Sequence, residues 1–173
     1  MRLIKPKFWE TKNFLSFIFF PFSVITYLVN ITKKISIKKN FEIKTICVGN
    51  IFLGGTGKTS LAIEINELLK KKFKTVFIKK NYENQSDEIN LLSNKGKIIS
   101  SDDRESALLS AEKKKYKVAI LDDGLQQKNI NYDLKIVCFN SEYALGNEYM
   151  LPAGPLRENL NEVKNYDLIF LNG

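Results

Sequence analysis

Gly49-Asn50-Ile51-Phe52-Leu53-Gly54-Gly55-Thr56-Gly57-Lys58-Thr59 is a glycine-rich run between an apolar β-like segment, 45–48, and an amphipathic helical segment, 60–69. Such a run binds a polyphosphate when small residues turn consecutive backbone N–H groups inward, a lysine meets the phosphate charge and a hydroxyl meets Mg²⁺. These groups are present at Gly54, Gly55, Gly57, Lys58 and Thr59. The run therefore predicts a site for a nucleoside triphosphate.

The strict motif G-x-x-x-x-G-K-[ST] would require glycine at position 52, where this chain has Phe52. The run therefore matches the chemical requirements of a phosphate loop and not its strict motif, because Gly54 and Gly55 still supply the permissive backbone that a tight loop needs. A chance glycine-rich turn is the alternative, but it would not explain a Lys-Thr pair at the end of the cluster. The expected nucleotide-binding residues are Phe52, Leu53, Gly54, Gly55, Thr56, Gly57, Lys58 and Thr59.

The composition limits the chemistry of the chain. Its 173 residues suffice for about one nucleotide-binding domain. Cys47 and Cys138 both lie in apolar runs, which predicts buried thiols instead of a disulfide or a metal pair. The chain contains no histidine, which excludes a histidine base, a Ser-His-Asp triad and imidazole zinc ligands.

The net charge of +8 is concentrated at one end of the chain. Residues 1–44 contain nine Lys/Arg and two acids, whereas residues 45–173 contain eighteen Lys/Arg and seventeen acids. A nucleic-acid-binding face would need the excess on the folded core, so no nucleic-acid partner is expected. We divide the chain into an N-terminal arm, 1–44, and a nucleotide-binding lobe, 45–173.

The arm has the composition of a membrane-associating segment. Twenty uncharged residues separate Lys12 from Lys33. Basic residues flank this run at Arg2, Lys5, Lys7, Lys12, Lys33, Lys34, Lys38 and Lys39, and such charges attract anionic lipid surfaces. Pro21 interrupts the run, which favours a bent helical hairpin or an in-plane helix over a spanning helix. A core helix of the soluble lobe is a further alternative.

Beyond the arm, apolar strand-like and helical segments alternate. The expected strands are Thr45–Gly49, Thr75–Lys79, Val118–Asp122, Leu134–Phe139 and Leu168–Leu171, and the expected helices are Lys58–Lys72 and Arg104–Lys115. Strands that are apolar on both faces are typical of parallel sheets covered by helices on both sides. The sequence predicts an α/β fold with a doubly wound, mostly parallel sheet, in which ligands bind beyond the carboxyl ends of the strands.

Two acidic sites follow expected strands. Asp122-Asp123-Gly124 directly follows an apolar strand, which is the arrangement that holds Mg²⁺, and Asp122 is the expected metal ligand. The second site is Ser86-Asp87-Glu88, after the strand Thr75–Lys79. Ser86 there is also a suitable helix cap with two acids in the first turn, so spacing alone leaves cap and catalyst both open.

Several runs spread over the whole chain match one known family. They are Pro6-Lys7-Phe8-Trp9, Pro21-Phe22-Ser23, Val48-Gly49-Asn50, the loop 54–59, Asp87-Glu88, Asp122-Asp123-Gly124-Leu125-Gln126, Gly146-Asn147 and Leu151-Pro152-Ala153-Gly154-Pro155-Leu156-Arg157-Glu158. In these runs the chain resembles the tetraacyldisaccharide 4′-kinases of lipid A biosynthesis, whose phosphate loop also lacks the first glycine. The resemblance implies a P-loop NTPase-like lobe.

The resemblance also implies an activity and a place. It implies transfer of the ATP γ-phosphate to the 4′-hydroxyl of tetraacyldisaccharide 1-phosphate at the cytoplasmic face of the bacterial inner membrane, which would form lipid IVA. The catalytic carboxylate falls on Asp87, Glu88 and Asp122 fall near Mg²⁺, and Thr59 is the loop hydroxyl. Lys58 and Mg²⁺ would neutralise the charge of the transferred group.

The chain departs from the family pattern in three places. Lys79-Lys80-Asn81-Tyr82 stands where the family has Ser-Arg-Gly-Tyr, and Gln127 stands where it has histidine. The chain ends at Leu171-Asn172-Gly173 and resembles the N-terminal lobe only, without the lobe whose histidine pairs with the catalytic Asp.

Two other functions stay open. One is a nucleotide-binding but catalytically incomplete fragment, which the missing lobe favours. The other is a membrane-associated regulatory ATPase, although such loops carry an extra lysine at the position of Leu53.

Overall fold

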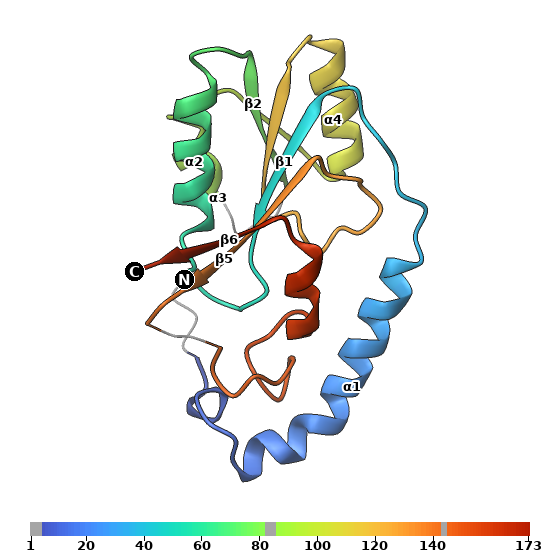
Figure 1. Cartoon of the computed structure of the whole chain (residues 1–173), viewed down its shortest axis with the longest axis vertical. Helices are drawn as coiled ribbons and strands as arrows, with labels where there is room; N and C mark the ends of the chain where they lie inside the picture. Colours follow the sequence, from blue (N-terminus) through green and yellow to red (C-terminus); the bar gives the residue numbers. More distant parts are fainter. Residues whose placement is uncertain (1–4, 82–85, 143–144) are drawn as a thin grey trace.

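The computed structural model describes residues 5–81, 86–142 and 145–173; Arg2 and Tyr82 lie outside these ranges. The elements in chain order are η1 (Lys7–Trp9), α1 (Phe14–Lys34), β1 (Lys44–Gly49), α2 (Lys58–Leu69), β2 (Thr75–Lys80), α3 (Ser86–Ser93), β3 (Ile98–Ser101), α4 (Arg104–Lys113), β4 (Val118–Asp122), β5 (Leu134–Asn140), η2 (Leu160–Asn165) and β6 (Leu168–Asn172). Figure 1 shows their arrangement.

The six strands form one sheet in the order β3-β2-β4-β1-β5-β6. Every strand pair recorded among the described residues is parallel. The register places Val48 of β1 opposite Asp122 of β4, so the phosphate loop and the acidic site leave the sheet from neighbouring strands at the same edge. This position is where ligands bind in open α/β sheets.

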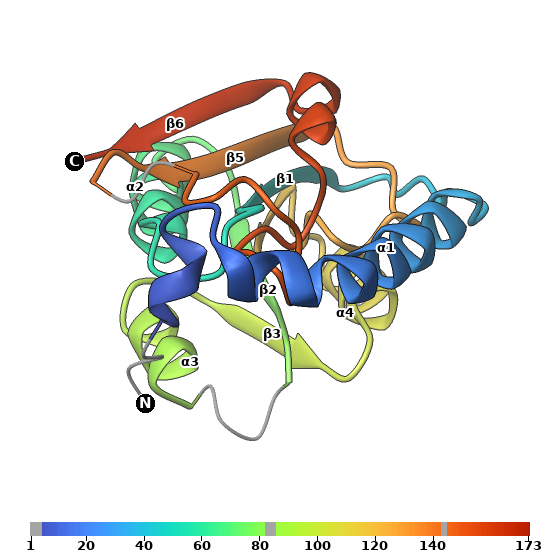
Figure 2. The same ribbon diagram turned by 90° about the horizontal axis from the view of Figure 1, so that it is seen from below.

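Helices cover both faces of this sheet (Figure 2). One face packs on α4 through Leu108 and the side chains of Val76 and Leu121. The other face packs on α2 and α3 through Phe77 and Ile120, which alternate with those residues along β2 and β4. Because both faces are buried, the strands are nearly continuous apolar runs. The prediction of a doubly wound α/β fold is confirmed.

The sequence prediction missed one strand and extended two helices too far, and four strands differ from it by one residue at one end. Strand β3 was not predicted, because it is a short edge strand whose residues are only partly buried. Helix α4 ends at Lys113 because Lys115 takes a left-handed backbone conformation, with φ of 59°, that a helix cannot continue. Helix α2 ends at Leu69, whose carbonyl accepts from both Lys72 and Phe73 in a tightened last turn.

Helix α1 is a single helix and not a hairpin, so the hairpin expectation is wrong. It begins with a capping box between Asn13 and Ser16 and contains Pro21. Figure 1 shows its axis changing direction, as an internal proline predicts. Its apolar window is only 11% buried, and the two residues of the helix that are buried are Ser16 and Ser23. The core-helix alternative is therefore also wrong for this structure.

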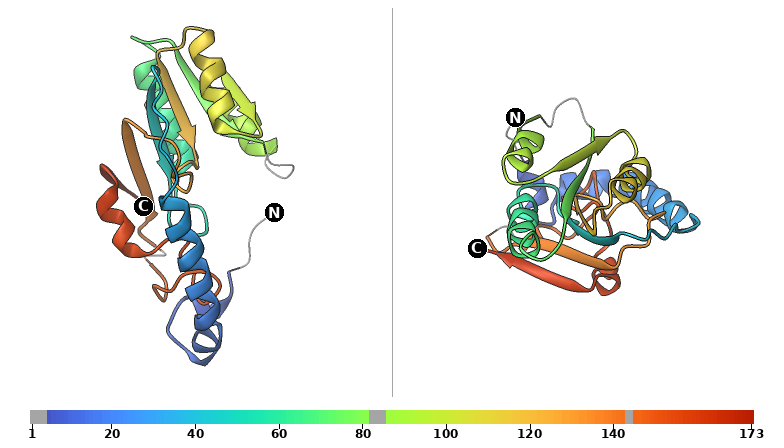
Figure 3. Two further views of the ribbon diagram at one scale, coloured as in Figure 1. Left: turned by 90° about the vertical axis from the view of Figure 1, so that its right-hand side faces the viewer. Right: turned by 90° about the horizontal axis from the view of Figure 1, so that it is seen from above.

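The helix docks through polar contacts with residues 145–162. The Ser23 hydroxyl donates to the Met150 carbonyl at 2.7 Å and accepts from the Ala153 N–H at 3.1 Å. Further along the helix, the Asn30 amide donates to the Arg157 carbonyl at 2.8 Å. Figures 1 and 3 show α1 mainly beyond the carboxyl-terminal edge of the central strands. The arm therefore lies at the same edge of the sheet as the candidate site.

Candidate functional site

The phosphate loop joins β1 to the first turn of α2. Gly57 is the N-cap of α2 and has a φ of 78°, in the left-handed region that favours glycine. A Cβ at this position would lie 2.8 Å from the Asn172 side chain, so a larger residue would also clash. Lys58 and Thr59 open the helix directly after it. The positive end of the α2 dipole thus faces the loop, as an anion site requires.

The first two residues of the expected nucleotide-binding set contact the segment 150–156. The Phe52 side chain is buried against Met150 and Leu156. The Leu53 N–H donates to the Pro155 carbonyl at 2.8 Å, so it is already paired. The sequence prediction included both residues because the motif G-x-x-x-x-G-K-[ST], aligned on Gly57-Lys58-Thr59, begins at position 52. These contacts anchor the start of the loop to the segment 150–156.

Asn50 holds the shape of the loop from inside. Its side-chain amide donates to the Gly54 carbonyl and to the Thr56 hydroxyl, each at 3.1 Å. Both Asn50 and Thr56 are buried. Because these polar atoms bond to each other, they support the curvature of the loop from inside.

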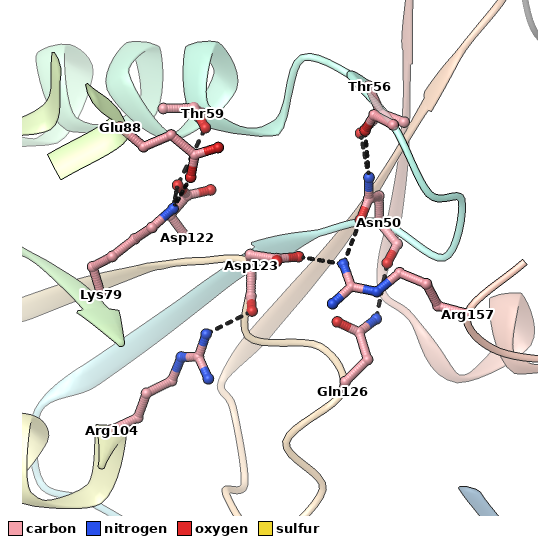
Figure 4. A network of polar contacts seen from close by, with 11 residues as sticks. Asn50, Thr56, Thr59, Lys79, Glu88, Arg104, Asp122, Asp123, Gln126 and Arg157 are labelled. Carbon is pink, nitrogen blue, oxygen red and sulfur yellow. Dashed lines mark hydrogen bonds and ion pairs between the residues drawn. The ribbon is translucent and has the colours of Figure 1, made fainter. Parts of the chain in front are cut away.

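The acidic site gathers around Asp122 at the end of β4 (Figure 4). The Thr59 hydroxyl donates to Asp122 Oδ2 at 3.2 Å. Lys79 Nζ lies 2.6 Å from the same oxygen and also forms an ion pair with Glu88. Asp122 is fully buried, and the Lys79 side chain is 1% exposed. Three of the expected functional residues, Thr59, Glu88 and Asp122, therefore lie together around one lysine.

The protonation of Lys79 follows from this setting. Burial by itself lowers the pKa of Lys79, and the charges and hydrogen bonds of Asp122 and Glu88 raise it. The carboxylates outweigh burial, so the pKa of Lys79 lies above its ordinary value. Lys79 is thus a permanent positive charge at the acidic site at neutral pH.

One atom of the acidic site is suited to a metal ion. Asp122 Oδ1 is buried and has no hydrogen-bond partner among the described residues. A hydroxyl and two carboxylates, from Thr59, Asp122 and Glu88, match the oxygen ligands that Mg²⁺ takes. No cluster of three or more His, Cys, Asp or Glu side chains that could hold a metal occurs in the described part of the chain. The residues fit an ion that receives its other ligands from phosphate oxygens and water.

Asp87 lies apart from these contacts. It is exposed in the first turn of α3, next to Glu88 in the chain. Asp87 and Glu88 occupy the first turn of α3, and the Glu88 carboxylate reaches Lys79. Cap and catalyst, the two alternatives for this run, both stay predictions. Asp87 faces solvent at the same edge of the sheet.

A second ionic network borders the loop on its other side (Figure 4). Arg157 Nη1 lies 2.8 Å from Asp123 Oδ1 and 3.0 Å from Asn50 Oδ1. Burial raises the pKa of Asp123, but the positive charges of Arg157 and then Lys58 outweigh it and hold this pKa below its ordinary value. Asp123 is thus an ionised partner for both cations. Its φ of 61° is uncommon for a residue other than glycine.

The sequence analysis gave these network residues no role. Asn50, Asp123 and Arg157 lie in runs that were recognised, yet their spacing along the chain does not show that they meet. Asp123 was visible as the second member of an Asp-Asp pair after a strand. The Arg104 guanidinium donates to the Asp123 carbonyl at 2.7 Å and to Gln127 Oε1 at 3.2 Å. Gln127 is the residue that stands where the family resembled by the sequence has histidine.

Comparisons with known proteins agree on one family. The family model described as tetraacyldisaccharide-1-P 4′-kinase matches residues 14–173. A tetraacyldisaccharide 4′-kinase of Pelagibacter ubique is 52% identical over this whole chain, and one of Rickettsia bellii is 31% identical. The chain covers 56% of the first relative and 60% of the second. It thus spans little more than half the length of the curated relatives it matches.

A solved structure has the same fold. It is described as the "apo" form of LpxK from Aquifex aeolicus in complex with ATP. The two chains superpose with a TM-score of 0.81 at 27% sequence identity, over 91% of this chain and 59% of the other. The ATP belongs to that protein's description.

Proposed function

Because this chain belongs to the tetraacyldisaccharide 4′-kinase family, we propose that it is the nucleotide-binding lobe of an enzyme that phosphorylates the 4′-hydroxyl of tetraacyldisaccharide 1-phosphate. ATP is the phosphoryl donor, and the product is lipid IVA. The observation that carries the proposal is the bond from Thr59, at the start of α2, to the buried Asp122. This contact joins the phosphate loop to the acidic strand end, as phosphoryl transfer requires.

Residues 54–59 hold the phosphates in this proposal. Their backbone N–H groups and the start of α2 bind the anion, and Lys58 neutralises the charge between the β- and γ-phosphates. Thr59, Asp122 and Glu88 would hold Mg²⁺. When bound, the ion supplies charge neutralisation to the transferred phosphoryl group.

Asp87 is the catalytic carboxylate of the proposal. It would orient the sugar hydroxyl and accept its proton as the oxygen attacks the γ-phosphorus. Its exposure on α3 supports this role, because a lipid acceptor has to approach from outside the lobe. Lys58 acts on the donor side of the same reaction.

The arm would bring this site to its acceptor. Residues 1–44 form the membrane-associating segment and residues 45–173 the nucleotide-binding lobe, at the cytoplasmic face of the inner membrane, where ATP is available. The exposed apolar side chains of α1 support this assignment, as do Lys33 and Lys34 in its last turn. The proposal includes no nucleic-acid partner, because the charge excess lies in the arm.

Two measurements test the proposal. The first is binding of Mg-ATP to this chain by calorimetry. Lys58→Ala should weaken binding about 10- to 100-fold, corresponding to about 1.5–3 kcal/mol for a hydrogen bond to a charged group. The exposed Lys71, in the turn just after the same helix, serves as the control, and Lys71→Ala should bind as the wild type does. Unchanged affinity in Lys58→Ala would refute the loop assignment.

The second measurement is transfer of labelled γ-phosphate from Mg-ATP to tetraacyldisaccharide 1-phosphate in mixed micelles. Asp87→Ala should leave ATP affinity unchanged and remove product. Nucleotide binding without any product would assign this chain as a catalytically incomplete half that needs the rest of the family's length. An equal loss of binding and transfer in Asp87→Ala would make Asp87 a structural helix cap.

A further inference from the structure

Lys79 lies where a divalent cation would be expected to lie. Its ammonium group contacts Asp122 at 2.6 Å and is ion-paired with Glu88, the two carboxylates assigned above to the metal. A buried lysine is rare and requires a counter-charge. Figure 4 shows the side chain reaching between the two acids beside Thr59.

The fold gives Lys79 this position through the sheet. Strand β2 pairs with β4, with Ile78 opposite Leu121, so the next residues, Lys79 and Asp122, lie side by side near the carboxyl ends of the two strands. Helix α3 then brings Glu88 over the same point. The lysine therefore joins β2, β4 and α3.

The charges of this cluster limit what else it can bind. Two carboxylates match one divalent cation, but Lys79 already neutralises one of the two negative charges. The same ammonium would also repel a divalent ion placed against Asp122, and this repulsion is weakly screened because the group is buried. Asp122 Oδ1 stays unpaired and available, whereas Oδ2 is taken.

We propose that Lys79 is an internal cation that competes with a free divalent metal for Asp122 and Glu88. A metal ion then enters this site only together with the phosphates of a nucleotide, whose negative charge compensates for the lysine. Lys79 is thus a positioning residue that selects the metal–nucleotide complex over the free metal. The inference rests on the proposed function only in taking Asp122 and Glu88 as metal-facing groups.

The test measures Mn²⁺ affinity of the protein without nucleotide, by electron paramagnetic resonance of the free ion. Lys79→Gln should bind Mn²⁺ at least about tenfold more tightly than the wild type, since a charge at contact distance is removed. Lys79→Arg keeps the charge and should stay near the wild type. Lys97→Gln removes one charge from an exposed position before β3, and its affinity should change by less than about twofold because surface charges are screened.

The tighter binding has to depend on the acidic site. The double variant Lys79→Gln/Asp122→Asn should lose the gain. No gain in Lys79→Gln, or a gain that persists in the double variant, would overturn the proposal.

Lys79→Gln also leaves the buried Asp122 without its cation, and an unpaired buried charge can unfold a variant in the absence of metal. In that event Mn²⁺ should restore its folded circular dichroism spectrum, whereas K⁺ at equal ionic strength should not. Failure of Mn²⁺ to restore folding would equally overturn the proposal. These readouts contain neither ATP nor lipid, so they are independent of whether the kinase activity is found.

Discussion

The guanidinium of Arg157 lies 2.8 Å from the carboxylate of Asp123. This ion pair connects the end of β4 to the segment 145–162, on which α1 docks. The Arg157 N–H donates to the Ile51 carbonyl at 2.7 Å, and its own carbonyl accepts from Asn30 of α1 at 2.8 Å. One residue thus contacts the phosphate loop, the acidic strand end and the arm.

The first prediction concerns the stability that this pair contributes. Arg157→Gln leaves a mostly buried carboxylate without its charge partner and should lower the free energy of unfolding by about 1–3 kcal/mol. Urea denaturation measures this change. The exposed pair of Lys44 and Asp133 is the matched control, and Lys44→Gln should cost less than about 1 kcal/mol. Equal losses in both variants would contradict the role given to Arg157.

The second prediction concerns acid. The pKa of Asp123 is held below its ordinary value because the charges of Arg157 and Lys58 outweigh burial. The unfolded chain therefore takes up this proton first, and the stabilisation by Asp123, complete above about pH 4, is lost as pH falls toward the lower folded pKa. In Asp123→Asn, this contribution to the loss of stability in acid is absent. Urea unfolding above and below about pH 4 should show that the difference in free energy of unfolding between wild type and Asp123→Asn shrinks in acid. A difference that stays constant with pH would refute this role of Asp123.

The third prediction concerns the docking of α1. Ser23→Val removes a buried hydroxyl that bonds to the Met150 carbonyl and the Ala153 N–H, so both backbone groups lose their partner. Hydrogen exchange of the amides in 147–157 should accelerate by about tenfold or more, corresponding to about 1–3 kcal/mol. Thr32→Val removes an exposed hydroxyl that bonds only within α1 and serves as the control. Unchanged exchange in Ser23→Val would show that the helix docks by other contacts.

The fourth prediction concerns the membrane. Phe17 and Ile25 of α1 are 73% and 58% exposed. The double variant Phe17→Glu/Ile25→Glu should reduce cosedimentation with phosphatidylglycerol-containing vesicles more than about tenfold, because each apolar side chain contributes about 1.5–3 kcal/mol when buried. Its free energy of unfolding should stay near that of the wild type, because neither residue is in the core.

The control for this prediction is Leu68→Glu/Leu109→Glu, which places the same two charges at exposed leucines of α2 and α4, outside the arm. That variant should bind vesicles as the wild type does. Similar losses in both proteins would mean that vesicle binding reflects net charge and not the arm.

Much of the fold could be predicted from sequence because its signals are local. Strands such as Val118–Asp122 are apolar on both faces, and this composition alone indicates a covered parallel sheet. The phosphate loop was visible because glycines and Lys-Thr lie within a few positions of one another. Strand β3 was missed because a partly buried edge strand has no such pattern. A single helix was among the alternatives for the arm, but Pro21 also suggested a hairpin where the helix only bends.

The site was less predictable because its contacts join distant residues. The sequence placed Thr59, Glu88 and Asp122 near a metal, and the structure brings them together without testing the metal itself. It gave no reason to expect Lys79 between the two acids. The packing of Phe52 and the pairing of Leu53 likewise came only from the segment 150–156, which lies about a hundred residues further along the chain.

By itself, the sequence determined five of the six strands and where the glycine-rich loop lies, since each depends on composition or spacing within a short window, and its short motifs together indicated the family. The tertiary structure alone decided which charges meet. Lys79 reaches Asp122 because β2 lies beside β4, and Arg157 reaches Asp123 because a loop folds back over the strand end. Ion pairs act over a few ångströms in space, and chain separation carries no information about that distance.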